Sequence, residues 1–303
     1  LHACSVKNIV LLCAFSFFFF LLYSVNMQVF SWDDVLNSKV SDFIAGSGTA
    51  LTVGGFDGPH RGHEVLCAKV VADARKRALL PGLITFTHSP RAFKQQDSYE
   101  GDISTLRLRL KVFKQWGFAF AVVIDFSSDF SKMEGYTFLT VLKDYCGMRF
   151  FEVGKLFRCG YNHAAGEDEI RKFAGEHGIE CDFVSLAADG GSRISSSAVR
   201  RCIRSGSLDK AEQLLGRPFE IDCLCFSAEN EGGKTVALKK YGGGQDCFQI
   251  LPPDGVYRVN VSASDAGKKI GFAADLHAGS SVLRLDVPDV YKNCRFDTIR
   301  FKK

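Results

Sequence analysis

Apolar runs and amphipathic stretches alternate regularly along the chain between residues 49 and 187. Patterns typical of buried strands occur at residues 49–56, 83–88, 118–126, 149–154 and 180–186. Stretches with helical spacing of apolar residues separate them, at residues 62–80, 104–117, 135–147 and 167–178. Alternation of this kind predicts an α/β fold, a Rossmann-like parallel sheet with helices on both faces. In such sheets, ligands bind beyond the carboxyl ends of the strands.

The pattern changes near residues 213–218. Short runs of alternating apolar and polar residues follow, at residues 219–226, 256–261 and 282–287, separated by turns rich in Gly, Asn and Asp. Such runs predict a small antiparallel β-barrel domain. We therefore place one domain at residues 27–215 and a second at residues 216–303.

The first 26 residues differ from the rest, because residues 9–25 form an uncharged apolar run. The run is shorter than the ~20 residues that comfortably span a bilayer, and no cleavage site with small residues follows it. The run has three interpretations: upstream sequence translated ahead of a true start at Met27, an uncleaved membrane anchor, or a signal peptide. We favour the first interpretation, since a sequence typical of soluble proteins opens at Met27. A membrane partner is expected only if residues 9–25 are a real anchor.

Composition narrows the class of protein. Apolar residues make up 46% of the chain and charged residues 24%, as in globular proteins. The net charge of +4 comes without a Lys/Arg cluster interleaved with aromatic residues, so no nucleic-acid partner is expected. The eleven cysteines are odd in number and include no CxxC pair. We expect reduced thiols and a cytoplasmic location.

One loop carries candidate chemistry, the stretch 53-VGGFDGPHRGHEVL-66. It places His60 and His63 between the first predicted strand of the alternation and the helix that follows. Glycines let backbone approach a ligand closely, and a helix N-terminus favours phosphate. Imidazole can donate hydrogen bonds to phosphate oxygens. The alternatives are two surface histidines on a turn, or a zinc site; no further zinc ligands are evident nearby, so no metal-ligating residue is expected.

A second candidate anion site is 194-ISSSAVR-200. Serine is a good N-cap, and residues 196–206 read as a helix that ends at a glycine. Arg200 lies one turn inside this helix, on a face that could reach a phosphate at the cap. Taken alone, the stretch is simply a well-capped helix.

These segments resemble a known family. The H-x-G-H spacing resembles the nucleotidyltransferase superfamily, whose histidines hold ATP phosphates. The whole loop is similar to the G-x-FDG-x-H-x-GH-x-x-L signature of prokaryotic FAD synthetases, the bifunctional riboflavin kinase/FMN adenylyltransferases. Further segments resemble family motifs in the same order: Phe86 with Pro90 and Arg91 (F-x-P-H-P-R), residues 153–160 (VG-x-DF-x-FG), residues 194–200 (ISST-x-IR) and residues 206–219 (G-D-x-x-x-A-x-x-LLGR-P-Y).

The resemblance implies that the protein makes FAD and pyrophosphate from FMN and ATP, with Mg²⁺ bridging the triphosphate. His60 and His63 would bind the phosphates, and Arg200, Ser196 and Ser197 would hold the leaving pyrophosphate. Asp57 is expected to shape the loop rather than to act as a base. The implied substrate-binding residues are Gly54, Gly55, Phe56, Asp57, Gly58, Gly62, Phe86, Arg91, Gly154, Phe157, Arg158, Asn162 and Ser195.

The sequence departs from the family pattern in the first domain at two positions. Ser89 replaces the histidine of P-H-P-R, and Leu156 replaces a polar residue near the flavin–phosphate site. The second change weakens FMN binding or shifts the role to Asn162 or His163.

The second domain departs further. Residues 227–250 lack the kinase segment G-x-PTAN, and Ser281 stands where the family has the glutamate base of the kinase. The turns at residues 251–259 and 289–291 remain similar, so we expect a folded barrel without kinase activity. The alternatives are a fully bifunctional enzyme, a non-catalytic flavin-binding regulator, or another transferase of the superfamily. The sequence predicts no oligomeric state.

Overall fold

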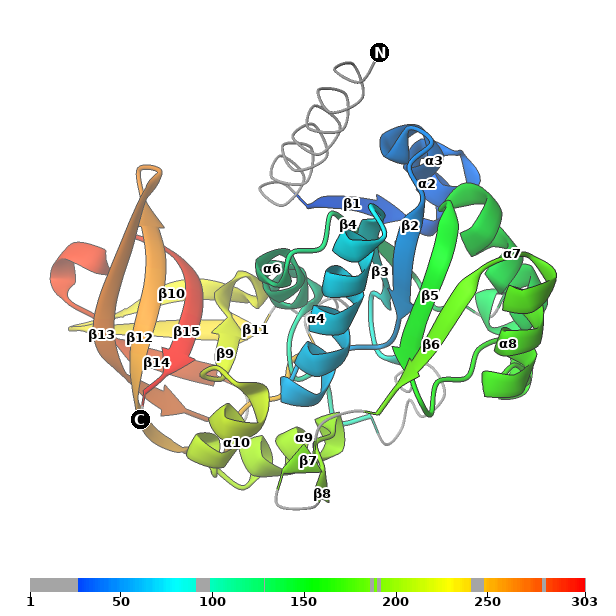
Figure 1. Ribbon diagram of the computed structural model, residues 1–303. Helices are drawn as coiled ribbons and strands as arrows, with labels where there is room; N and C mark the ends of the chain where they lie inside the picture. Colours follow the sequence, from blue (N-terminus) through cyan, green and yellow to red (C-terminus); the bar gives the residue numbers. More distant parts are fainter. Residues whose placement is uncertain are drawn as a thin grey trace, which may run out of the picture. The chain divides into compact units, whose positions relative to one another are not determined.

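The computed structural model describes residues 27–90, 99–127, 129–185, 188–189, 192–240, 248–279 and 282–302. The apolar run at residues 9–25 lies outside these ranges. Within them the chain forms two compact units (Figure 1). The first contains residues 27–56, 63–90 and 110–185, and the second contains residues 57–62, 99–109 and 188–302. No helix in the described ranges is both long enough and apolar enough to span a membrane.

The first unit is built on a six-stranded sheet whose strand pairings are all parallel. This confirms the Rossmann-like sheet expected from the alternating pattern. In spatial order its strands are β1 (Gln28–Ser31), β4 (Phe120–Ile124), β3 (Leu80–Phe86), β2 (Thr49–Val53), β5 (Met148–Gly154) and β6 (Glu180–Val184).

Helices cover both faces of this sheet, because side chains alternate between the faces along each strand. On one face, Ala50 and Leu83 pack with Leu66 of helix α4 and Phe113 of helix α6. On the other face, Leu51, Ile84 and Val122 pack against helices α2, α3, α7 and α8. The helices span Trp32–Leu36 (α2), Lys39–Ile44 (α3), Arg61–Lys76 (α4), Leu106–Trp116 (α6), Gly135–Tyr145 (α7) and Glu167–Glu176 (α8).

A four-residue ion cluster joins α4 to strands β5 and β6. The Lys69 ammonium donates to Asp73 Oδ2 and Asp182 Oδ2, both at 2.8 Å, and to Glu152. The Glu152 side chain is fully buried, and burial raises the pKa of its carboxyl group. Hydrogen bonds from Lys69 hold the pKa values of Asp73 and Asp182 below their usual range. Lys69 therefore neutralises carboxylates that would otherwise repel one another.

We expect Lys69→Met to lower the free energy of unfolding by about 1–3 kcal/mol at neutral pH, because it leaves Glu152 buried without a cation. Lys69 is 40% exposed, so water screens part of the loss. The stabilisation from the lowered pKa values of Asp73 and Asp182 is present above the ordinary value of 3.8 and disappears as the pH falls through the lowered values. Denaturant titrations should therefore show a smaller difference at low pH.

Lys39→Met is the matched control for that measurement. Lys39 pairs with Asp34 on the surface, where Lys39 is 61% exposed. Exposed pairs contribute little, so we expect a change of less than about 1 kcal/mol. Equal effects of the two substitutions would show that the buried Glu152 does not depend on Lys69.

The second unit is built on a seven-stranded sheet whose strand pairings are all antiparallel. The sheet curls into a half-barrel, as the short alternating runs predicted. Two helices, α9 (Ser196–Arg204) and α10 (Leu208–Leu215), belong to the same unit. In spatial order the strands are β10 (Phe226–Gly232), β11 (Thr235–Lys240), β14 (Val282–Asp286), β13 (Lys268–Ala278), β12 (Gly255–Asp265), β15 (Arg295–Phe301) and β9 (Glu220–Asp222).

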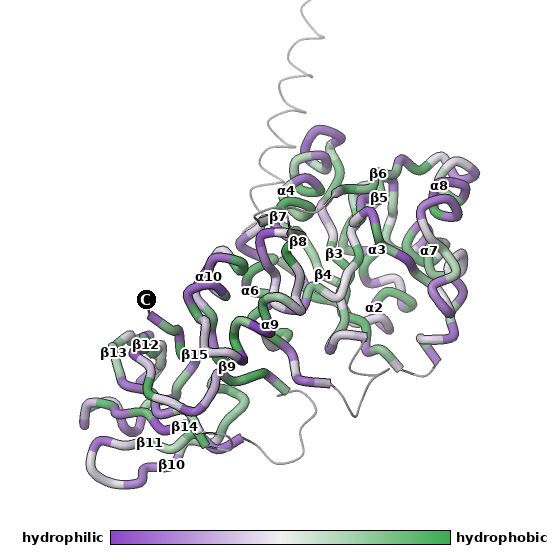
Figure 2. Tube along the Cα trace, turned by 90° about the horizontal axis from the view of Figure 1, so that it is seen from below, coloured by the Kyte–Doolittle hydropathy of each residue, from purple (hydrophilic) through white to green (hydrophobic). Residues whose placement is uncertain are grey.

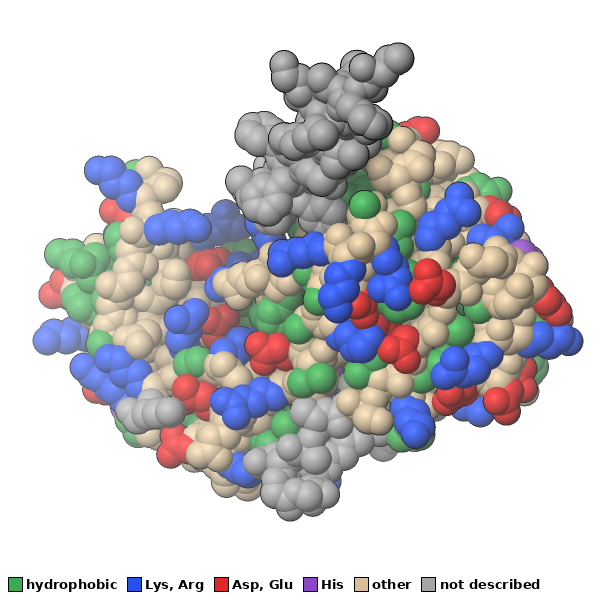
Figure 3. Space-filling view, viewed as in Figure 1, with side chains coloured by type: hydrophobic (Ala, Val, Ile, Leu, Met, Phe, Trp, Pro, Cys, Tyr) green, Lys and Arg blue, Asp and Glu red, His purple; other side chains and the backbone are tan. Residues whose placement is uncertain are grey.

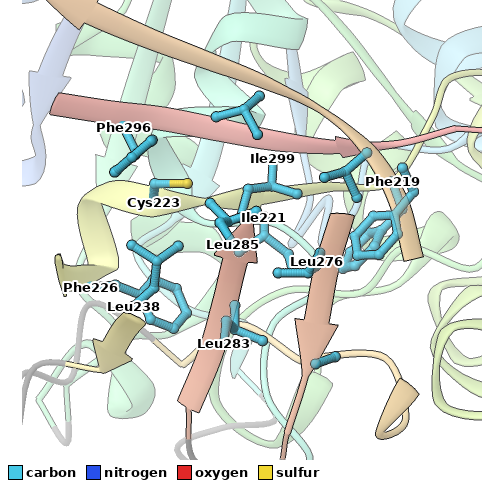
Figure 4. Packing of buried hydrophobic residues seen from close by; sticks show 14 of the residues in the cluster. Phe219, Ile221, Cys223, Phe226, Leu238, Leu276, Leu283, Leu285, Phe296 and Ile299 are labelled. Atoms are coloured by element: carbon cyan, nitrogen blue, oxygen red, sulfur yellow. The ribbon is translucent and has the colours of Figure 1, made fainter. Parts of the chain in front are cut away.

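The half-barrel encloses its own hydrophobic core, shown in Figure 4. Phe219, Ile221, Leu276, Leu285 and Ile299 converge there from several strands. Along the long hairpin of β12 and β13, hydrophilic positions alternate with hydrophobic ones, which is visible in Figure 2. The side chains that point inward form the core, and those that point outward face solvent.

The cysteines correct one expectation. Seven described cysteines have free thiols, and burial raises the pKa of Cys146 and of Cys159 to about 12. Cys225, however, is disulfide-bonded. The expectation of reduced thiols throughout is therefore wrong at this residue. Counting cysteines could not reveal it, because a disulfide depends on how closely two residues approach in space.

Candidate functional site

The carboxyl ends of the parallel strands gather several of the expected site residues at one edge of the first unit. Gly54 and Gly55 follow β2, Phe86 ends β3, and Gly154 ends β5. Strand β2 lies between β3 and β5, so these residues are neighbours in the sheet. Arg91, expected at the same edge, lies outside the described residues. Open parallel sheets bind ligands at this edge.

The turn after β2 supports His63 through an aromatic ring. A side chain on Gly54 would collide with the Phe56 ring, its Cβ lying 2.8 Å from the nearest ring carbon. Phe56 adopts a φ of 43° and is only 4% exposed. Its ring packs edge-on against the imidazole of His63, with the ring centroids 5.1 Å apart. Phe56 thus contacts a histidine from within the core, and its expected part in substrate binding stays a prediction.

The turn after β5 holds a second set of expected residues. The Phe157 amide donates to the Gly154 carbonyl at 2.7 Å, and the Phe157 ring packs against Phe151. The Arg158 Nε donates to the His163 carbonyl at 2.7 Å. Asn162 is exposed with a φ of 52°. Leu156, which replaces a polar residue of the family pattern, is 74% exposed.

The second unit holds the loop at residues 57–62, and Asp57 is its centre. Asp57 is 6% exposed, and its Oδ1 accepts a hydrogen bond from the Ile103 amide at 2.7 Å. Its Oδ2 accepts from Arg200 Nη2, and its backbone carbonyl accepts from Ser196 Oγ at 2.7 Å. Every one of these contacts fixes the loop, so the geometry agrees with a structural role for Asp57.

The other loop residues are closely packed in the same unit. Gly58 has a φ of 56°, and a Cβ there would lie 2.5 Å from the Ile103 side chain. His60 is 2% exposed, and a Cβ on Gly62 would lie 3.0 Å from its ring. The loop therefore favours glycine at both positions. Gly58 provides the positive φ and the space beside Ile103, and Gly62 provides the space beside His60.

Helix α9 presents its N-terminus through the expected serines. The Ser195 Oγ accepts a hydrogen bond from the Ala198 amide at 3.2 Å, which makes Ser195 the N-cap. Ser197 is partly exposed in the first turn. Arg200 donates from Nε and Nη2 to the Gly101 carbonyl, at 3.2 and 3.1 Å, in addition to its pair with Asp57. Its Nη1 donates to no described residue.

The pKa of Asp57 is raised to about 6, chiefly by burial and also by the nearby charge of Asp102, although Arg200 and Arg109 lower it. Arg109 itself is 1% exposed. The segment that supplies Ile103, Asp102 and Arg109 was not among the residues expected from sequence. The signal in the sequence is weak: two arginines alternate with leucines in 104-STLRLRL-110, which indicates that a charged side chain of this segment is buried.

No group of three or more His, Cys, Asp or Glu side chains in the described ranges forms a metal site. On the face drawn in Figure 3, basic and acidic side chains are intermixed over the parallel-sheet unit. The arrangement has two features: a largely buried glycine loop with imidazoles at the start of helix α4, and the capped helix α9 with its arginine. Both features suit polyphosphate.

Comparisons with known proteins identify the family of this chain. The family model of FAD synthetase matches residues 44–198. The bifunctional riboflavin kinase/FMN adenylyltransferase of Escherichia coli (strain K12) is 30% identical over 215 residues, which cover 71% of this chain and 68% of that protein. The FAD synthetase of Listeria monocytogenes is 24% identical over 210 residues, covering 69% of this chain and 80% of that protein.

A solved structure shares the fold of nearly the whole chain. It is titled a macrolide-efflux protein from Streptococcus pneumoniae, and it aligns with a TM-score of 0.71 at 21% identity, covering 91% of this chain and 89% of its own. At this identity the likeness shows the fold alone. The family match includes the loop at residues 57–62 and the serine cap of α9. The chain belongs to the FAD synthetase family.

Proposed function

We propose that this FMN adenylyltransferase uses the loop at residues 57–62 and the start of helix α9 to bind ATP phosphates, and that its second domain no longer phosphorylates riboflavin. The observation that carries the first part is the hydrogen bonding of Asp57 to Ile103, Arg200 and Ser196. A loop fixed this firmly can hold His60 in one position. Preorganised donors contribute most to stabilising charge in a transition state.

The reaction is a direct displacement. An oxygen of the FMN phosphate attacks the α-phosphorus of ATP, a new P–O bond forms, and the bond to the bridging oxygen breaks to release pyrophosphate. The FMN phosphate is already nucleophilic, so the protein needs neither a covalent intermediate nor a base. Positioning and charge stabilisation supply the catalysis.

Each candidate residue then has a role. His60 and His63 bind the phosphates, and Ser196, Ser197 and Arg200 hold the leaving pyrophosphate. Arg200 can do this while it keeps Asp57 in place, because Nη1 is not used by the described residues. Mg²⁺ would enter with the triphosphate, as is general in nucleotidyl transfer. The Asp57 carboxylate is already engaged by Ile103 and Arg200, so we do not assign it to the metal.

The turns after β2, β3 and β5 are the proposed flavin and adenosine surface. Gly54, Gly55, Phe86, Gly154, Phe157, Arg158 and Asn162 are the residues concerned. The exposed Leu156 offers no hydrogen bond to FMN, which leaves Asn162 or His163 to make the polar contact.

The proposal that the second domain has lost kinase activity is supported by its sequence. The half-barrel retains a packed core, but residues 227–250 lack the kinase's phosphate-binding segment. We propose residues 27–215 as the transferase domain and residues 216–303 as the degenerate kinase-like domain. A cytoplasmic location is supported by the seven free thiols, with Cys225 as the exception.

The test is to incubate the protein with Mg-ATP and either riboflavin or FMN, and to separate the flavins by chromatography. We expect FAD from FMN and no product from riboflavin. The appearance of FMN from riboflavin would show a bifunctional enzyme and overturn the loss of the kinase. Bound flavin without any product would instead identify a non-catalytic regulator.

A further inference from the structure

Residues 99–109 connect the half-barrel to the Asp57 loop, and we call them the linking segment. All of their contacts described below lie within the second unit. The segment contains none of the recognised family motifs, yet it is held firmly on two sides. Its hydrogen bonds connect strand residues of the half-barrel with the loop at residues 57–62.

On the half-barrel side, Arg107 forms a bidentate pair with Asp222 of β9. Nε and Nη2 donate to the two carboxylate oxygens at 3.0 and 2.6 Å, and Nη1 donates to Asp297 at 2.7 Å. Thr105 Oγ donates to the same Asp222 carboxylate at 2.6 Å. Asp222 is 2% exposed. Bidentate arginine–carboxylate pairs fix orientation as well as position.

Gln249, which is 3% exposed, reinforces this attachment through both polar atoms of its side chain. Its Oε1 accepts from the Asp222 amide at 2.9 Å, and its Nε2 donates to the carbonyls of Ile103 and Glu220 at 2.9 and 2.7 Å. The backbone adds a short parallel bridge, in which Asp102 donates to Phe248 at 2.7 Å and accepts from Ile250 at 2.9 Å.

On the other side, the same residues hold the Asp57 loop. The Ile103 amide donates to Asp57, and the Gly101 carbonyl accepts from Arg200. Ile103 therefore joins the two sides through one peptide residue, with its N–H bound to Asp57 and its carbonyl bound to Gln249. Its side chain also packs against Gly58.

We infer that the half-barrel positions the adenylyl-transfer loop through the linking segment, with Gln249, Arg107 and Asp222 as positioning residues. This rests on the proposed function of the loop at residues 57–62. If Gln249 no longer holds Ile103, the Asp57 carboxylate loses its fixed partner and His60 loses its fixed place. Misplacing a catalytic group by about 1 Å can lower a rate by ~10²-fold, even when the change lies far from the reacting atoms.

The test compares Gln249→Met and Arg107→Lys with the wild-type protein in two measurements. Gln249→Met keeps the side-chain volume and removes three hydrogen bonds. Arg107→Lys keeps the positive charge but cannot form the bidentate pair with Asp222. We expect kcat for FAD formation to fall by ~10-fold or more, with KM for ATP changed less than ~3-fold, because position rather than ground-state binding is lost. Hydrogen–deuterium exchange should rise in peptides that cover residues 57–62 and stay unchanged in the β12–β13 hairpin.

Arg300→Gln is the matched control, because it removes an exposed ion pair with Glu220 from the neighbouring strands without touching the linking segment. The Arg300→Gln variant should leave unchanged both kcat for FAD formation and hydrogen–deuterium exchange at residues 57–62. If Gln249→Met does not fold, Thr105→Val carries the test, since it removes one hydrogen bond to Asp222.

The two proposals can fail separately. Unchanged exchange at residues 57–62 together with an unchanged kcat overturns the coupling. If wild-type protein makes no FAD, the proposed function fails, whereas raised exchange at residues 57–62 in the variants still establishes the mechanical link.

Discussion

His63→Ala is expected to lower kcat for FAD formation by ~10²-fold or more, because removal of one donor to a transferring oxyanion has this effect in other enzymes. Phe56 packs edge-on against the imidazole, with ring centroids 5.1 Å apart, and so holds it in one orientation. His60→Ala should cause a comparable loss. The measurement is single-turnover formation of FAD from FMN and saturating Mg-ATP, followed by chromatography.

A suitable control is His277→Ala. His277 lies on the half-barrel, is 46% exposed, and bonds to Asp286. This substitution should leave FAD formation at the wild-type rate. His60 is buried, so thermal unfolding must be measured in parallel to separate lost folding from lost chemistry. A His63→Ala protein that is folded and forms FAD at a rate close to that of the wild type would remove His63 from the mechanism.

Arg200→Met is expected to lower both FAD formation and stability. The side chains of Arg200 and Asp57 are 12% and 7% exposed, so the substitution leaves a buried carboxylate without the arginine that pairs with it. Breaking such a pair costs about 3–5 kcal/mol at neutral pH. Activity should fall by ~10²-fold, since both the phosphate contact and the loop geometry are lost.

The loss of stability should depend on pH in a defined direction. The folded pKa of Asp57 is raised from 3.8 to about 6, chiefly by burial. Its contribution to stability is therefore fully present below 3.8 and is lost as the pH rises through about 6. Without Arg200, which lowers this pKa, the folded value rises further. Denaturant titrations of the Arg200→Met protein should show a larger deficit near pH 7 than near pH 4.

The double variant Asp57→Asn/Arg200→Met provides the control for this argument. With no carboxylate to bury, it should recover part of the stability that Arg200→Met loses, and its pH dependence should flatten. The single variant Asp57→Asn completes the comparison. If the stability loss of the double variant equals the sum of the losses of the two single variants, Arg200 and Asp57 do not act as a pair.

The alternation of strands and helices was enough to predict the parallel sheet, because its central strands are rich in apolar residues, as in the FAVVI of β4. Strand β1 was missed. Residues 28–31 are short and mostly exposed, and they become a strand only because they pair with β4 at the sheet edge. Local pattern carries no information about such an edge pairing.

For the site, the glycines and histidines after β2 and the serine cap of α9 could be found from sequence, since both follow local rules for loops and helix ends. The contacts of Asp57 with Ile103 and Arg200 could not. They join residues that are 46 and 143 positions apart, and Arg107 meets Asp222 at a separation of 115. Spacing along the chain says nothing about which buried carboxylate meets which donor.

The backbone of Ile103, whose N–H donates to Asp57 and whose carbonyl accepts from Gln249, bears on how this protein can evolve. A domain that no longer phosphorylates riboflavin, as we propose for this half-barrel, would ordinarily drift freely. Here selection for FAD would still act on Asp222 and Gln249, as well as on Arg107. Drift should then be tolerated at the exposed strand positions of the half-barrel, while the side that faces the linking segment stays under purifying selection.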